Sequence, residues 1–174
     1  MRRASPQAGL SAIELVLLVA FLGVMGAVAW PRWQVLQRDY NEAYAIGSMR
    51  AIMSAQGDYH AVNAGFAADL AALGKACPGT PVTWLSPELA ANGAEFAGYL
   101  FTATPSGGAV QGVRDCNGTS TYNGYYVSAR PVDGGETGDR GFAGSSAGEL
   151  WQSPDGVPPP EPLEKSGTIS VVPR

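Results

Sequence analysis

The sequence predicts an α+β protein in which one long N-terminal helix packs against a small antiparallel β-sheet. Three observations lead to this prediction. Residues 10–30 are almost uniformly apolar. Apolar residues then recur at helical spacing to about residue 59, with polar residues between them. The remainder holds short β-like runs separated by turn residues, in a chain of 174 residues with 23 Gly and 13 Pro. This length suits one domain with an appendage.

The apolar segment 10–30 contains a single charged residue, Glu14. A helix of this length extends about 31 Å, which matches a hydrocarbon core of about 30 Å. Two arginines, Arg2 and Arg3, precede it and carry the only charges of the N-terminal stretch. Positive charge before a first apolar segment keeps the N-terminus cytoplasmic. We therefore predict that 10–30 spans a membrane and that the rest of the chain lies across it.

Three interpretations of this N-terminus compete. It is a secretory signal cut after Ala29, an uncleaved anchor, or a segment cut after Gly9. A carboxylate inside a spanning helix costs about 2.5–3.5 kcal/mol, so such residues usually have a function. Cleavage after Gly9 would leave a free ammonium on Leu10, four residues from Glu14 and on the same helix face. A neighbouring subunit's ammonium can also neutralise that carboxylate in an apolar bundle. Glu14 therefore favours the third interpretation.

The run Gly9-Leu10-Ser11-Ala12-Ile13-Glu14 resembles the precursors of type IV pilins and pseudopilins. In that family a short basic leader ends in Gly, and a Glu occupies the fifth mature position of a long apolar helix. The family often has a glycine followed by a proline eight residues later, as at Gly23 and Pro31. The resemblance covers residues 9–31 and the leader. Leu10 replaces the commonest phenylalanine, and Ser-Ala replaces the frequent Thr-Leu.

The resemblance implies a processing and assembly route. A membrane prepilin peptidase would remove residues 1–9 and methylate the amine of Leu10. The spine helix 10–62 would then assemble into a homo-oligomeric helical filament, driven by an inner-membrane platform and a motor ATPase. Gly23 and Gly26 would permit close helix packing, and Pro31 would kink the helix or mark the membrane boundary.

Location and role follow from the same resemblance. The precursor would reside in the inner membrane, and the product would be a type IV pilus subunit in a cell-surface filament. The alternative within the family is a periplasmic pseudopilin of a type II secretion system. Outside the family, the alternative is a membrane-anchored monomeric binding protein.

The head, residues 63–174, is expected to be rich in β-structure. Two short helices are predicted at 67–73 and 87–91, the second capped by Ser86. A loop is predicted at 152–164, where prolines cluster. Strands are predicted at 99–103, 109–113, 125–129 and 168–172, with a hairpin formed by 141–143 and 149–152.

Cys77 and Cys116 are the only cysteines of the chain. In a head outside the cytoplasm they are expected to form a disulfide. The bridge would close a loop of about 40 residues and contribute roughly 3–4 kcal/mol on the chain-entropy model.

Composition excludes several function classes. A net charge of −4 argues against nucleic acid as a partner. One histidine and two cysteines nearly exclude a multi-ligand Cys/His zinc site, because such sites need three or four ligands, and His60 would be the only base for a Ser or Cys nucleophile. We expect no enzyme activity and no cofactor. The one metal candidate is a calcium-binding loop with Asp133, Glu136 and Asp139. The major pseudopilin of type II secretion resembles this arrangement in having a calcium-bound loop. The preferred interpretation of these three residues is a solvated turn without a metal.

Overall fold

The computed structural model describes residues 11–173, the side chains of 28–31 excepted. The predicted cleavage and methylation positions, Gly9 and Leu10, lie outside the described residues. The chain divides into two compact units, one ending at Leu36 and the other beginning at Gln37. The second unit contains the whole sheet together with the second half of the long helix.

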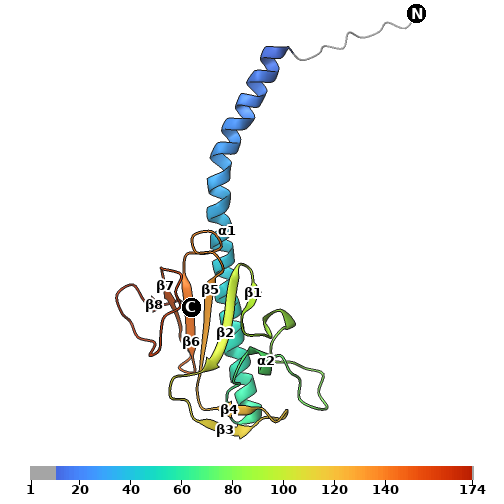
Figure 1. The fold of residues 1–174 in the computed structure, drawn as a ribbon, viewed down its shortest axis with the longest axis vertical. Coiled ribbons are helices and arrows are strands. Elements are labelled where there is room, and N and C mark those ends of the chain that lie inside the picture. The colour runs from blue at the N-terminus through green and yellow to red at the C-terminus, as the bar shows by residue number, and fades with distance from the viewer. Residues whose placement is uncertain (1–10, 174) are drawn as a thin grey trace, which may run out of the picture. The chain divides into compact units, whose positions relative to one another are not determined.

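Helix α1 runs from Ala12 to Asn63, a length of 52 residues (Figure 1). It begins one turn before Leu15, whose backbone N–H donates to the Ser11 carbonyl at 3.0 Å. Its helical conformation continues through Pro31, so the proline does not end the helix. The predicted end near residue 62 agrees with the observed end at Asn63.

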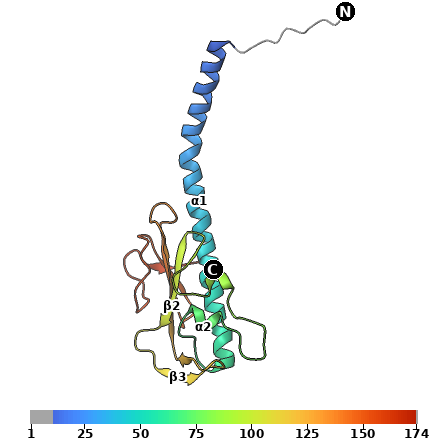
Figure 2. The same cartoon turned by 45° about the vertical axis from the view of Figure 1, so that its right-hand side comes forward.

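The larger sheet has six antiparallel strands in the order β1-β2-β5-β6-β7-β8 (Figures 1 and 2). Strands β3 and β4 form a separate two-stranded sheet. The strand bounds are β1 Ala94–Phe96, β2 Tyr99–Pro105, β3 Gln111–Arg114, β4 Ser120–Tyr122, β5 Tyr125–Pro131, β6 Gly141–Ser145, β7 Leu150–Ser153 and β8 Ser170–Val171. The predicted α+β class is confirmed: a long helix packed with an antiparallel sheet.

The core lies between one face of the sheet and the second half of α1. Along β2 and β5 alternate residues are buried, as a sheet with one covered face requires. The pairing of Phe101 with Ala129 and of Ala103 with Val127 keeps these residues on the same face. From α1 the largest buried side chains are Met49, Ile52 and Tyr59.

Several local predictions were wrong in detail. Strands β1 and β4 were not predicted, because three-residue runs carry too little alternation to be distinguished from turns. The helix predicted at 87–91 is a single 3-10 turn, η1 (Pro87–Leu89), and the Ser86 side chain makes no capping hydrogen bond. Helix α2 (Leu70–Leu73) is shorter than predicted and begins where the Asp69 carboxylate accepts from the Ala72 N–H.

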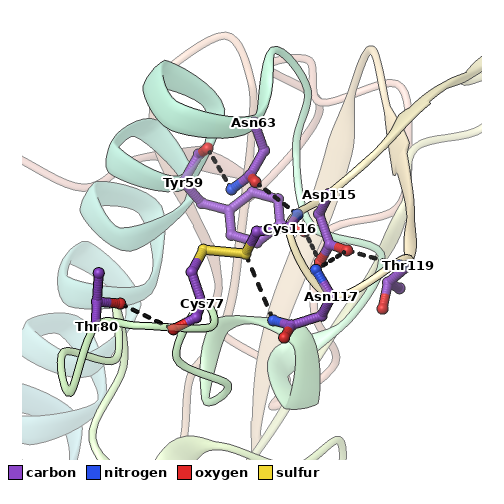
Figure 3. Close-up of a disulfide and its surroundings, with 8 residues drawn as sticks. All are labelled: Tyr59, Asn63, Cys77, Thr80, Asp115, Cys116, Asn117 and Thr119. Atoms are coloured by element: carbon purple, nitrogen blue, oxygen red, sulfur yellow. Dashed lines mark hydrogen bonds between the residues drawn. A yellow bond between two sulfur atoms is a disulfide. The ribbon is translucent and has the colours of Figure 1, made fainter.

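The predicted disulfide between Cys77 and Cys116 is confirmed, with 5.5 Å between the two Cα atoms. Figure 3 shows that the bridge lies beside the end of α1. The backbone N–H of Cys116 donates to the Asn63 side chain at 3.3 Å. The neighbouring Asp115 accepts from the Tyr59 hydroxyl at 2.7 Å. The loop that carries Cys116 is thereby attached to the last turns of α1.

Asp115 is buried but well supplied with donors. Besides Tyr59, it accepts from the backbone N–H groups of Asn117 at 2.9 Å and Thr119 at 2.6 Å. Burial, followed by the hydrogen bond to Asp115, raises the pKa of Tyr59 well above its usual value. The tyrosine therefore stays a neutral donor at all ordinary pH values.

Replacing both cysteines, Cys77→Ser with Cys116→Ser, should lower the free energy of unfolding by roughly 3–4 kcal/mol, because the unfolded chain regains the entropy of an open loop. Chemical denaturation followed by circular dichroism measures this difference. A wild-type sample unfolded with reductant should approach the stability of the double variant. A double variant as stable as the oxidised protein would contradict the prediction.

Candidate functional site

The described side chains in the first half of α1 present an exposed, largely apolar surface. Every described side chain from residue 11 to residue 27 is exposed. The most apolar window of the helix has none of its residues buried within the described structure. Exposed apolar surface on this scale marks contact with lipid or with another protein. Its large hydrophobic residues are Ile13, Leu15, Val16, Leu17, Leu18, Val19, Phe21, Leu22, Val24, Met25, Trp33, Val35 and Leu36.

This helix is long and apolar enough to cross a membrane. The length and composition fit either a retained anchor or a cleaved signal sequence near the N-terminus. The prediction of a membrane-spanning segment at 10–30 is thus supported over the residues that the structure describes.

Glu14 occupies the first turn of α1 and has a partner there. Its Oε2 accepts a hydrogen bond of 2.8 Å from the backbone N–H of Ser11. Ser11 directly precedes the helix, so Glu14 is its third residue and the pair forms one half of a capping box. A negative charge in the first turn also interacts favourably with the helix dipole. The capping role of Glu14 was not predicted, although the Ser-x-x-Glu spacing is typical of a capping box.

Gly23 and Gly26 have open space around them. A Cβ atom at either position would meet no atom within 4 Å outside the local helix backbone. No contact within the described chain therefore requires a glycine at these positions. Their spacing of three residues places them on one side of the helix. Close packing against another helix remains the prediction for both, as does the packing role of Pro31.

The three carboxylates of the predicted calcium loop do not converge. Both oxygens of Asp139 lie 3.2 Å from Nη1 of Arg38, which neutralises this carboxylate. Among the described residues no group of three potential ligands from His, Cys, Asp and Glu is placed to hold a metal ion. The loop that contains Asp133 and Glu136 is closed by Thr137, whose N–H and hydroxyl both donate to the Asp133 carbonyl.

A second interaction fastens the same loop to α1. Glu42 is 6% exposed, and its Oε1 accepts from the backbone N–H groups of Asp139 at 2.8 Å and Arg140 at 3.1 Å. Its Oε2 accepts from Nε of Arg140 at 2.7 Å. Arg140 also donates to the side chain of Gln152 on β7 at 2.7 Å. A buried charge is thus fully paired, as burial requires.

In the sequence, Glu42 is one of the polar residues between the helically spaced apolar residues of the second half of α1. It lies three residues before Ala45 and seven before Met49, both fully buried. The spacing places the Glu42 carboxylate on the buried stripe of the helix, where it needs a partner from the opposing element. This position could have predicted the ion pair from the sequence.

Comparisons of the chain with protein-family models, with curated proteins and with solved structures give no match.

Two ion pairs in this loop differ in burial and give a matched test. Glu42→Ala leaves Arg140 and two backbone N–H groups without their acceptor, and we expect a loss of about 3 kcal/mol in the free energy of unfolding. Asp139→Ala removes a pair whose carboxylate is 55% exposed, and should cost less than about 1 kcal/mol. Urea denaturation of both variants measures the difference. Equal losses would show that burial of Glu42 contributes nothing.

Proposed function

We propose that this chain is a structural subunit of a filament of the type IV pilus class. In this proposal the chain is processed after Gly9 and polymerises through the first half of α1. The observation that carries the proposal is an apolar helical surface that residues 11–173 leave uncovered, with one carboxylate at its N-terminal end. The resemblance of residues 9–31 to prepilin sequences supports the same assignment.

The chemistry of assembly follows from the position of Glu14. Processing after Gly9 exposes an ammonium on Leu10, four residues before the carboxylate. A carboxylate has about four acceptor sites, so the bond from the Ser11 N–H leaves capacity for an ammonium from the same or a neighbouring subunit. In an apolar bundle an unpaired charge is expensive, so this pairing would select one register of neighbouring helices.

Hydrophobic burial alone would not drive polymerisation. Lipid is as apolar as a helix bundle, so moving α1 from membrane to filament changes little apolar exposure. Packing at Gly23 and Gly26 and the pairing of Glu14 would therefore supply specificity. Extraction of the helix from the membrane would need an external energy source, which is the role we assign to a motor ATPase.

The head has the features of a domain that works outside the cytoplasm. A disulfide joins Cys77 to Cys116, and such bonds persist in oxidising compartments. This arrangement suits a cell-surface pilus and also a periplasmic pseudopilus. The two differ in whether fibres can be sheared from the cell surface.

Substitutions at Glu14 separate its two roles. Glu14→Gln keeps an acceptor for the Ser11 N–H but removes the charge, so the helix should form normally while filament yield falls strongly. Glu14→Asp keeps the charge and should retain more yield than Glu14→Gln. Electron microscopy and immunoblots of sheared fibres measure yield, and membrane fractionation confirms insertion. Normal yield from Glu14→Gln would reduce Glu14 to a helix cap and contradict the proposed pairing.

The mature N-terminus tests the assignment directly. Mass spectrometry of the protein purified from whole cells and culture medium should find a chain that begins at Leu10 with a methylated amine. A chain beginning at Met1 would favour an anchored monomeric protein, and one beginning at Trp30 a secreted protein. Either result would overturn the filament proposal.

A further inference from the structure

The chain contains three Asn-Gly sequences, which begin at Asn92, Asn117 and Asn123. We propose that Asn117 is a site of spontaneous deamidation and that the fold protects the other two. Asparagine is a thermolabile residue, and a following glycine favours the reaction because it has no Cβ to obstruct the approach of its backbone nitrogen. This inference is independent of the proposed function.

The reaction needs only water. The backbone nitrogen of Gly118 would attack Cγ of Asn117 and form a five-membered succinimide, while the side-chain nitrogen leaves as ammonia and the backbone proton passes to solvent. Water then opens the ring at either carbonyl. The products are aspartate, or isoaspartate with an additional methylene group in the main chain. No oxidant or cofactor takes part.

At Asn92 both reacting groups, the side-chain amide and the backbone nitrogen of the following glycine, are held by hydrogen bonds. Its Oδ1 accepts from the backbone N–H groups of Leu70 at 3.3 Å and Ala103 at 3.0 Å, and its Nδ2 donates to the Ala103 carbonyl at 2.8 Å. The would-be nucleophile, the N–H of Gly93, donates to the Phe101 carbonyl at 2.7 Å. Attack would require breaking all four hydrogen bonds.

Asn123 is held by fewer but short contacts. Its Oδ1 accepts from the Val110 N–H at 2.7 Å, and its own N–H donates to the Val110 carbonyl at 3.1 Å. The following Gly124 is packed against the Ser106 hydroxyl, which restricts movement of its backbone. The side-chain carbonyl therefore cannot rotate toward the Gly124 nitrogen without losing a good hydrogen bond.

Asn117 differs from both. It is exposed, and the hydrogen bond recorded for its side chain within residues 11–173 runs from Nδ2 to the Sγ atom of Cys116 at 3.6 Å (Figure 3). Sulfur is a weak acceptor, so the side chain is almost free to rotate. The Gly118 N–H donates to the Asp115 carbonyl at 3.1 Å in a turn with Gly118 at φ +80°.

Release of the Gly118 nitrogen would need opening of the exposed tip of this hairpin, while Tyr59 and the disulfide keep Asp115 and Cys116 attached to α1. The turn joins β3 and β4, whose pairing consists of Gln111 with Tyr122 and Arg114 with Ser120, with an irregularity between them. Every residue of β3 is exposed. Short, exposed pairs of strands open at low free energy without global unfolding.

The product would alter the surroundings of the disulfide. A carboxylate at position 117 would stand beside Asp115, which already accepts from the N–H groups of residues 117 and 119. Isoaspartate would also lengthen the main chain between Asp115 and Thr119. We therefore expect the modified form to carry one additional negative charge and to hold the Cys116 loop less firmly.

The test compares the three sites within one molecule. The detergent-solubilised full chain, with its disulfide intact, is incubated at mildly alkaline pH. Peptide mapping with fragmentation that distinguishes aspartate from isoaspartate then follows each Asn-Gly site over time. We expect conversion at Asn117 several times faster than at Asn123 and Asn92. In a reduced and denatured sample the three rates should converge, because the structural protection is lost.

Two variants provide controls through the charge profile of the folded protein. Asn117→Gln should abolish most of the slow drift toward more acidic forms, whereas Asn123→Gln should leave the drift unchanged. Conversion at Asn92 or Asn123 that equals conversion at Asn117 in the folded protein would overturn the proposal. So would an unchanged Asn117 in the folded state.

Discussion

The structure depends on how helix α1 divides its apolar surface. From Ala45 to Tyr59 one stripe of the helix is fully or almost fully buried beneath the sheet, and this burial is the main source of stability for the head. Residues 11–27 find no such cover within the described chain. One continuous helix thus combines the core of a folded domain with a surface that needs a different partner. The proposed function follows from that division.

Buried polar side chains add specificity to this core. Glu42 fastens the loop between β5 and β6, and Asp115 binds Tyr59 beside the disulfide. Between them, the fully buried Gln56 donates to the Ala67 carbonyl at 3.2 Å and accepts from the Ala67 N–H at 2.9 Å. Each of these groups satisfies loop backbone with side-chain atoms, so the loops cannot shift along the helix without exposing unpaired donors.

The features that could be predicted from the sequence are those that follow from the periodicity of apolar residues or from the number of cysteines. Strands β2 and β5 have clear alternation, α1 has an unbroken apolar run followed by a 3.6-residue period in its second half, and two cysteines allow one internal bridge. The buried polar contacts escaped prediction because they join different elements, with separations of 11 residues for Gln56 and Ala67, 56 for Tyr59 and Asp115, and 98 for Glu42 and Arg140. The capping contact between Ser11 and Glu14 is local and follows from their spacing, but Glu14 was interpreted only as a partner for a free amine. Cleavage after Gly9 and methylation of Leu10 stay predictions.

The fastenings along α1 also have a mechanical consequence. Glu42 and Tyr59 are 17 residues apart on the helix, which corresponds to about 25 Å along its axis. A tensile load applied to α1 would be shared among attachments distributed over that length, so that they are strained in shear together and do not unzip one at a time. Beyond the C-terminal end of α1, the disulfide between Cys77 and Cys116 prevents residues 77–116 from being extended. Attachments spread in this way would resist traction along the helix better than a single attachment would.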